Sequence, residues 1–192
     1  PLRLVGSEMC IRDRSGETSD TIKSAQRVKE FSNLATLCIT NNEESTIWNL
    51  CDYKAACYAG TEQGIAATKS FTSQMLCLIL ISLKLVEKIH GDNATIGYKK
   101  SLFSLPAVVD KALAKREDIK KLAAILAKEN TIVITADGIS YSLAKEAALK
   151  IKETSYKNIS AAILGEFMHG HVAVLNNPSM PVSYTHLRAH ET

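Results

Sequence analysis

The sequence has few of the features that mark metal proteins, nucleic-acid-binding proteins or membrane proteins. Its five cysteines are scattered and none forms a Cys-x-x-Cys pair, so we expect free, buried thiols in a reducing cytoplasm and no metal site. A formal net charge of +3, with no basic run, argues against nucleic acid or an anionic membrane as a partner. The longest apolar stretch, 75–83, is about half of the roughly 20 residues that a membrane span needs, so we expect a buried helix there.

Arginine is scarce in the middle of the chain and frequent at its ends. Residues 15–181 contain seventeen lysines and two arginines, whereas the remaining 25 residues contain four arginines and no lysine. We interpret 1–14 and 182–192 as foreign sequence of the kind that translated sequencing adapters produce, and 15–181 as the genuine protein. A pair of natural polar tails is the alternative interpretation.

Strands alternate with helices along the genuine segment. The spacing of apolar residues predicts strands at 34–40, 53–58, 131–135 and 159–163. It predicts helices or helical turns at 19–31, 45–50, 64–89, 101–129 and 140–157. This alternation indicates an α/β fold of parallel sheets flanked by helices, in two incomplete copies. We expect the first copy at 15–91, a helical connection at 92–128 and the second copy at 129–181.

The first candidate site is the hydroxyl-rich loop Ser15-Gly16-Glu17-Thr18, which leads directly into a predicted helix. Backbone N–H groups at a helix N-terminus favour anions, so the two hydroxyls and the Gly16 backbone suit a phosphate. An ordinary helix cap, in which a serine or threonine is followed by an acid, is the alternative.

The second candidate runs from Ala59 to Phe71 and reads Ala-Gly-Thr-Glu-Gln-Gly-Ile-Ala-Ala-Thr-Lys-Ser-Phe. Its small residues allow a ligand to approach the start of a helix closely. A tightly packed loop before a helix explains the same residues equally well.

The third candidate is a row of charged residues on one predicted helix. Glu146, Lys150 and Glu153 are spaced four and three residues apart and so share one face. Ala147, Leu143 and Ile151 lie elsewhere on the helix and can pack. An acid–base–acid row suits a sugar and can move a proton between adjacent carbons. A solvated ion-pair face is the alternative.

The fourth candidate is the segment 165–171, Gly-Glu-Phe-Met-His-Gly-His. His169 is suited to proton transfer on a sugar hydroxyl. His169 and His171 suggest a metal site, but no third ligand is evident. A structural histidine in a loop is the remaining alternative.

Together and in this order, the four motifs resemble those of the glucosamine-6-phosphate synthase family, the isomerising glutamine–fructose-6-phosphate aminotransferases. The shared patterns are Ser-Gly-Glu-Thr-x-Asp-Thr, Ala-Gly-x-Glu-x-Gly-x-Ala-x-Thr-Lys-x-Phe, Glu-x-Ala-Leu-Lys-x-Lys-Glu-x-Ser-Tyr and Gly-Glu-x-x-His-Gly. The resemblance covers essentially all of residues 15–181. It implies two sugar-isomerase (SIS) domains, each a flavodoxin-like three-layer sheet, that bind fructose 6-phosphate without a metal or an organic cofactor.

The resemblance also implies roles for individual residues. Phosphate binding falls to Ser15, Gly16 and Thr18, and further substrate contacts fall to Ile65, Ala67 and Glu146. Glu153 is implied to move the proton between C1 and C2, and Lys150 to assist near the reacting carbons. His169 is implied to open the sugar ring in the active site of the neighbouring subunit, so the resemblance implies a homodimer.

The chain departs from the family pattern at several positions. Ala67 stands where the family has a serine that touches the sugar, which weakens the substrate assignment more than the fold assignment. Arg14 stands where the family has a glutamine, as expected if foreign sequence replaces it. The family's Gly-Arg-Gly is here Ala136-Asp137-Gly138, and its Lys-His-Gly-Pro is here 168–171, Met-His-Gly-His.

Other parts of the family's protein are missing from the sequence. These are the N-terminal glutaminase domain, which is the partner that supplies ammonia, the first strands of the first SIS domain, the final strands of the second, and the C-terminal tail with its Schiff-base lysine. We therefore expect the chain alone to be inactive and poorly folded.

Two other functions remain open from the sequence. A stand-alone SIS deaminase or isomerase acting on an amino-sugar phosphate is compatible with Ala67. A non-catalytic sugar-phosphate sensor is the third possibility, although retention of Glu153, Lys150 and His169 argues against it.

Overall fold

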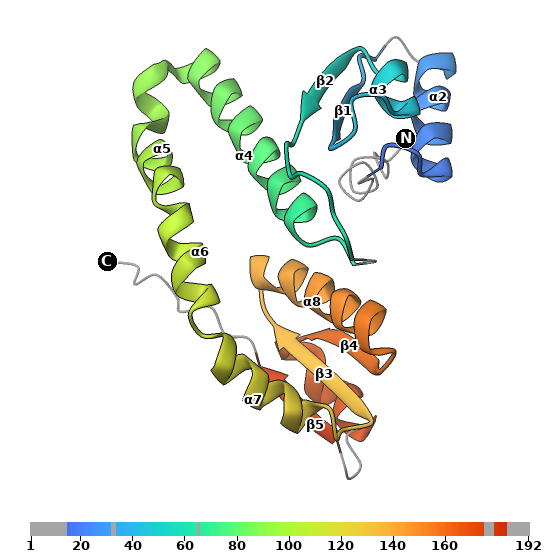
Figure 1. Ribbon diagram of the computed structural model, residues 1–192, viewed down its shortest axis with the longest axis vertical. Helices are drawn as coiled ribbons and strands as arrows, with labels where there is room; N and C mark the ends of the chain where they lie inside the picture. Colours follow the sequence, from blue (N-terminus) through green and yellow to red (C-terminus); the bar gives the residue numbers. More distant parts are fainter. Residues whose placement is uncertain (1–14, 32–33, 65, 175–178, 184–192) are drawn as a thin grey trace. The chain divides into compact units, whose positions relative to one another are not determined.

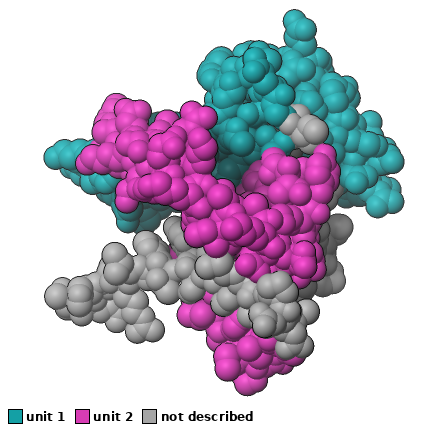
Figure 2. All heavy atoms as spheres, turned by 60° about the horizontal axis from the view of Figure 1, so that its bottom comes forward, with its two compact units in different colours: residues 1–102 teal, residues 103–192 magenta. Residues whose placement is uncertain are grey.

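The computed structural model describes residues 15–31, 34–64, 66–174 and 179–183. The chain divides into two compact units, residues 1–102 and residues 103–192 (Figure 2). Each unit has its own small parallel sheet and its own cluster of buried apolar side chains.

The first unit is built around two parallel strands (Figure 1). In chain order its elements are α2 (Ser19–Phe31), β1 (Leu37–Thr40), α3 (Thr46–Leu50), β2 (Tyr53–Ala56), α4 (Lys69–His90), η1 (Asp92–Thr95) and α5 (Ile96–Phe103). β1 and β2 pair with Leu37 opposite Tyr53 and Thr40 opposite Ala56. Parallel pairing requires the chain to return to the same sheet edge, and the segment containing α3 makes that return. The strands predicted at 34–40 and 53–58 are thus confirmed with shorter bounds.

Buried side chains of α2, β1 and the α3 region form the core of the first unit. This cluster contains Ala25, Cys38, Ile47 and Cys51. Burial, and to a lesser extent the neighbouring Cys51 thiol, raise the pKa of the Cys38 thiol to about 11. The expected buried free thiols are confirmed at Cys38, Cys51 and Cys57, whereas Cys77 is half-buried and Cys10 lies outside the described residues.

Asp52 ties the start of β2 to the residue that precedes β1. Its carboxylate accepts hydrogen bonds from the Thr36 N–H at 2.9 Å and the Thr36 hydroxyl at 2.7 Å, and from the Lys29 ammonium at 3.0 Å. These contacts hold the pKa of Asp52 well below its usual range, and the hydrogen bond from the Thr36 N–H is the largest cause. They fix the strand register at the amino edge of the sheet.

α4 differs most from the sequence-based expectation. It begins at Lys69 rather than at residue 64, and it ends at His90, where Gly91 is the C-cap with a φ of +87° that suits glycine. None of its apolar residues between 75 and 83 is buried: half of them are exposed, Leu80 by 49%, and the others are half-buried. The prediction of a buried helix is therefore wrong for the described chain. By length and composition α4 also meets the criterion for a membrane span, which core helices of soluble proteins meet equally.

Glu87 joins α4 to the elements that follow it. The buried carboxylate pairs with the Lys99 ammonium of α5, accepts a hydrogen bond from the Thr95 hydroxyl of η1, and accepts one from the Lys84 ammonium at 3.0 Å. The Lys99 contact is the largest cause of a pKa lowered to about 2. Because its partners come from three successive elements, Glu87 holds the α4–α5 turn together.

The second unit contains a three-stranded parallel sheet. Its elements are α6 (Leu105–Leu113), α7 (Arg116–Leu126), β3 (Thr131–Ala136), α8 (Ile139–Ser155), β4 (Asn158–Ile163), η2 (Leu164–His169), η3 (His171–Val174) and β5 (Ser179–Ser183). The strand order is β4-β3-β5, with Thr131 opposite both Asn158 and Ser179. α8 packs across β3 and β4 (Figure 1), and the core consists of Ile132, Ile134, Ala136, Ala144, Ala148 and Ile159. Parallel strands flanked by helices confirm the predicted fold class.

The segment between the two sheets is helical, as predicted, and it contains α5, α6 and α7. Pro106 lies in the first turn of α6, a position that proline tolerates because its missing N–H has no helical partner there. Within the described chain, no residue of α5, α6 or α7 is buried, and Phe103 is 87% exposed. The predicted division at 15–91, 92–128 and 129–181 stays a prediction, and β5 continues two residues beyond 181.

Candidate active site

The hydroxyl loop at residues 15–18 is held against the start of α3. Gly16 has φ +69° and is buried, and a Cβ at this position would overlap the Cβ and Oγ atoms of Ser45. The Ile47 N–H donates to the Gly16 carbonyl at 3.1 Å. Only glycine fits both the left-handed backbone and this close approach, so the loop's shape depends on Gly16.

Glu17 caps α3 rather than α2. Its carboxylate accepts the Thr46 N–H and the Thr46 hydroxyl, each at 2.7 Å, and these bonds lower its pKa. The Thr18 carbonyl accepts the Ile22 N–H at 3.0 Å and so begins α2. Ser15 and Thr18 are exposed residues beside the N-terminus of α2. The loop predicted to bind phosphate is therefore an ordered turn, and its one acidic residue, Glu17, is hydrogen-bonded to the N-terminus of α3.

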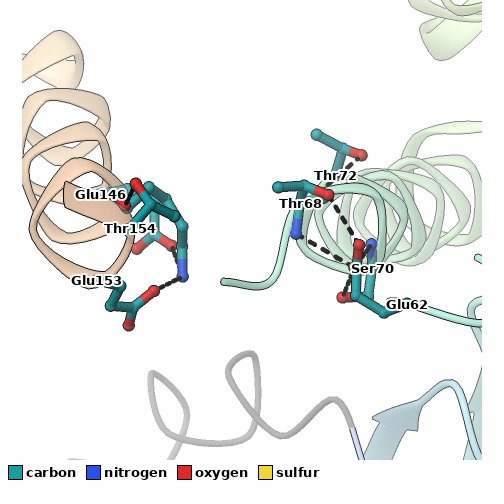
Figure 3. Close-up of polar contacts among 8 residues, drawn as sticks. Glu62, Thr68, Ser70, Thr72, Glu146, Glu153 and Thr154 are labelled. Atoms are coloured by element: carbon teal, nitrogen blue, oxygen red, sulfur yellow. Dashed lines mark hydrogen bonds and ion pairs between the residues drawn. The ribbon is translucent and has the colours of Figure 1, made fainter. Parts of the chain in front are cut away.

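Glu62 caps α4 from the loop that precedes it (Figure 3). Its carboxylate accepts hydrogen bonds from the hydroxyl and N–H of Ser70 at 2.7 and 3.1 Å, and from the hydroxyl and N–H of Thr68 at 2.8 and 3.2 Å. The Ser70 hydroxyl is the largest cause of a pKa lowered to about 2. The second motif is thus a capped loop and helix start. Ala67 is half-buried in it, and Ile65 lies outside the described residues.

Glu146, Lys150 and Glu153 lie together on α8, as the spacing predicts (Figure 3 labels the two acids). The Lys150 ammonium lies 2.9 Å from a Glu153 oxygen and 3.4 Å from a Glu146 oxygen. The side chain of Lys150 is 24% exposed, that of Glu153 is 33% exposed and that of Glu146 is 15% exposed. By contrast, the Glu117–Lys120 pair on α7 is about three-quarters exposed on both sides. The row on α8 is therefore a partly desolvated cluster, unlike the solvated ion pairs of α7.

The packing face of α8 is not the one that the sequence suggested. Leu143 is 50% exposed and Ile151 is 36% exposed, so the prediction that they pack is wrong for the described chain. Ser140, Ala144 and Ala148 are the buried residues. Close packing of α8 on β3 and β4 leaves room for small side chains only, and a search for large apolar residues misses such a face.

His169 lies at the end of η2, which follows the carboxyl end of β4 directly. It is exposed and has no side-chain hydrogen bond or ion pair with the described residues. α8 runs antiparallel to β4, so Glu153 lies toward the amino end of β4, a strand that spans roughly 17 Å. Glu153 and His169 of one chain thus lie toward opposite ends of strand β4, and the structure does not bring them into contact.

The structure also contains features that the sequence did not reveal. The roles of Glu17, Glu62 and Asn41 in holding loops depend on contacts between segments. Glu62 precedes α4 by seven residues, which is only a weak signal, and Glu17 caps a helix that begins 29 residues further along the chain. Among the described residues, no three of the His, Cys, Asp and Glu side chains lie together in a way that would hold a metal ion. The side chain of His171 lies outside the description.

The SIS domain sequence profile matches residues 9–83 and 125–182, more than half of the chain. The chain belongs to the SIS domain family. The match begins six residues before residue 15, within the segment interpreted as foreign, and the structure does not describe those residues.

Among curated proteins, this SIS domain chain is similar to glutamine–fructose-6-phosphate aminotransferases [isomerizing]. The identity is 33% over 171 residues for that of Pseudomonas aeruginosa and 36% over 172 residues for that of Haemophilus influenzae. In each case the alignment covers 88% of this chain and 28% of the relative. The chain therefore spans a little over a quarter of the length of these relatives.

Solved structures agree with this placement. The C-terminal domain of glucosamine-fructose-6-phosphate aminotransferase from Francisella tularensis superimposes with a TM-score of 0.84 at 28% identity, covering 93% of this SIS domain chain and 54% of that chain. Glucosamine-6-phosphate deaminase from Thermotoga maritima gives a TM-score of 0.68 at 24% identity, covering 88% of this chain and 50% of that one. The second likeness shows a shared fold only.

Proposed function

We propose that this chain is the sugar-phosphate isomerase region of a glutamine–fructose-6-phosphate aminotransferase, which makes glucosamine 6-phosphate from fructose 6-phosphate and glutamine-derived ammonia. The observation that carries the proposal is the partly buried Lys150 ammonium between the carboxylates of Glu146 and Glu153. The names of the relatives with 33% and 36% identity support it. The glutaminase domain that supplies ammonia is a partner in this proposal.

The hydroxyl loop is the proposed phosphate site. Ser15 and Thr18 are exposed at the N-terminus of α2, a 13-residue helix whose dipole favours an anion there. Gly16 supplies backbone where a side chain would not fit. Glu17 would repel a phosphate, but its charge is engaged by the N-terminus of α3. The N-terminus of α4 is already occupied by Glu62, which leaves the start of α2 as the better anion site of the first unit.

Ile65, Ala67 and Glu146 are the proposed contacts for the rest of the sugar. Ala67 lies immediately before Thr68, at the start of α4, and presents a methyl group where a serine would present a hydroxyl. One hydrogen bond to the substrate is therefore absent from this position or comes from another residue. Glu146 carries an acceptor oxygen beside Lys150 that suits a sugar hydroxyl.

Glu153 is the proposed proton carrier in the ketose-to-aldose step. Its carboxylate takes the proton from C1 of the open-chain sugar and returns it to C2, while the proton of the C1 hydroxyl is transferred to the oxygen at C2, so the ketose becomes an aldose with no net gain or loss of protons. Negative charge develops on an oxygen of the substrate as the C1–H bond breaks. The Lys150 ammonium, 2.9 Å from Glu153, stabilises that charge.

His169 is proposed to open the sugar ring in the active site of a second copy of the chain. The observation that supports this is the placement of Glu153 and His169 toward opposite ends of strand β4. A site that needs both residues is then completed by a neighbouring subunit. A cytoplasmic homodimer is the assembly that we propose, and the exposed apolar residues of α5–α7 are surfaces that further protein would cover.

A stand-alone amino-sugar-phosphate deaminase or isomerase is the second candidate, and Ala67 is the observation that favours it. The protein expressed from its complete gene distinguishes the two. Formation of glucosamine 6-phosphate from fructose 6-phosphate that requires glutamine supports the aminotransferase. Release of ammonia from glucosamine 6-phosphate, with no use of glutamine, favours the deaminase. Sugar-phosphate binding without turnover of either substrate contradicts both and indicates a sensor.

A further inference from the structure

Tyr58 adopts a backbone conformation that tyrosine normally avoids. Its φ is +46°, in the left-handed region. Its side chain is 83% exposed and makes no hydrogen bond, ion pair or ring contact with the described residues. Neither burial of the ring nor a contact of the ring offsets the backbone strain. Strain of this kind is concentrated at functional sites.

Tyr156 shows the ordinary reason for such a conformation. Its φ is +58° and it is 84% exposed, but it ends α8, and its N–H donates to the Lys152 carbonyl at 2.9 Å. A left-handed residue is a common end to a helix because it satisfies such a carbonyl. Tyr58 follows a strand, so this explanation does not apply to it.

Asn41 holds the loop around Tyr58 in place. Its side-chain oxygen accepts the Ala59 N–H at 2.8 Å and the Cys57 thiol at 3.7 Å, and its side-chain nitrogen donates to the Gly60 carbonyl at 2.7 Å. One side chain thus fixes residues on both sides of Tyr58. The turn is therefore held by hydrogen bonds to the neighbours of Tyr58, and the Tyr58 side chain takes no part in them.

Tyr58 lies at the edge of the sheet where ligands bind in parallel α/β folds. It comes two residues after β2, and Asn41 comes directly after β1. The same loop after β1 reaches the hydroxyl loop, since Ser45 packs on Gly16 and lies only four positions after Asn41 in the chain. That separation is at most about 14 Å of chain. The hydroxyl loop and Tyr58 therefore border one edge of the first unit.

We propose that the Tyr58 ring is a platform on which the sugar of a phosphorylated hexose packs while Ser15 and Thr18 hold its phosphate. This proposal rests on the proposed function and adds a substrate-binding residue to it. The C–H groups of a sugar carry partial positive charge and match the negative face of an aromatic ring. The left-handed backbone keeps the ring in solvent at the sheet edge, where such a ligand can reach it.

Three substitutions in the protein expressed from its complete gene test this role. Tyr58→Asn removes the ring but keeps a residue that tolerates the left-handed conformation. Tyr58→Phe keeps the ring. Tyr156→Asn is the matched control, because it relieves similar strain at an equally exposed tyrosine. Calorimetric titration measures the affinity for fructose 6-phosphate and, separately, for inorganic phosphate, and thermal unfolding measures Tm.

We expect Tyr58→Asn to weaken binding of fructose 6-phosphate by about five- to tenfold and to leave binding of inorganic phosphate unchanged. Its Tm should rise by about 2–4 °C. Tyr58→Phe and Tyr156→Asn should bind like the wild type. Wild-type affinity of Tyr58→Asn for fructose 6-phosphate, or an equal loss for both ligands, overturns the proposal. If the wild-type protein itself does not bind fructose 6-phosphate, the proposed function fails and this role fails with it.

Discussion

The Glu62 carboxylate accepts hydrogen bonds from both the hydroxyl and the N–H of Ser70, eight residues further along the chain. Ser70 is completely buried, so its polar atoms need a partner within the protein. The contact explains why α4 begins at Lys69 although the apolar pattern starts earlier. It also assigns the acid of the second motif to the scaffold of the site.

Replacing Glu62 by Gln should destabilise the protein at neutral pH. The variant keeps the shape but loses the charge that the α4 N-terminus favours, so Tm should fall by about 2–4 °C. The folded pKa of about 2 lies below the ordinary 4.5, so the stabilisation is complete above pH 4.5 and is lost as pH falls toward 2. Thermal unfolding between pH 7 and pH 2.5 should show the two proteins converging in acid. Glu43→Gln, at an exposed acid, is the control, and a constant difference across this range contradicts the account.

Replacing Gly16 by Ala should be strongly destabilising. The alanine would have to adopt the left-handed backbone conformation, and its Cβ would overlap Ser45. Together these two effects should lower the free energy of unfolding by about 2–4 kcal/mol. Gly97→Ala is the matched control, because Gly97 lies in α5 with open space around it. There we expect no loss and at most about 1 kcal/mol of stabilisation. Chemical denaturation measures both values, and equal effects at the two positions would falsify the proposed packing of the hydroxyl loop.

Two inactive variants should restore activity when their subunits are mixed. Glu153→Gln removes the proposed proton carrier, and His169→Gln removes the proposed ring-opening group. If each site takes Glu153 from one chain and His169 from the other, half of the heterodimer sites contain both native residues. A random equal mixture then regains about a quarter of wild-type synthase activity. No recovery after subunit exchange shows that one chain supplies both residues or that the site is not shared.

The sequence predicted what depends on periodicity and could not predict what depends on contacts between distant segments. Ser19–Phe31 is a helix with the predicted bounds, and Thr131–Ala136 differs from the predicted strand by one residue. The prediction that Leu80 and Leu143 are packed against other residues was wrong, because apolar spacing identifies one face of a helix but does not show what covers that face. The charged row on α8 followed from helical spacing alone.

The candidate site was only partly accessible from the sequence for the same reason. The motif order indicated the family, but single motifs were equally compatible with helix caps. Glu17 and Glu62 are indeed caps, a result that needs the positions of Thr46 and Ser70 in space. The left-handed φ of Tyr58 could not be predicted from the sequence, because the Asn41 amide that holds the neighbouring Ala59 lies 18 positions earlier in the chain.

The most direct test of the account is whether Glu153 carries the proton between C1 and C2. In the protein expressed from its complete gene, fructose 6-phosphate deuterated at C1 should give product with deuterium at C2 or released to solvent, both followed by NMR. Glu153→Gln should slow this transfer at least about a hundredfold while substrate binding persists. Glu117→Gln, which breaks an exposed ion pair of the same spacing, should transfer at the wild-type rate. Wild-type transfer by Glu153→Gln would contradict the assignment of the α8 cluster as the catalytic centre.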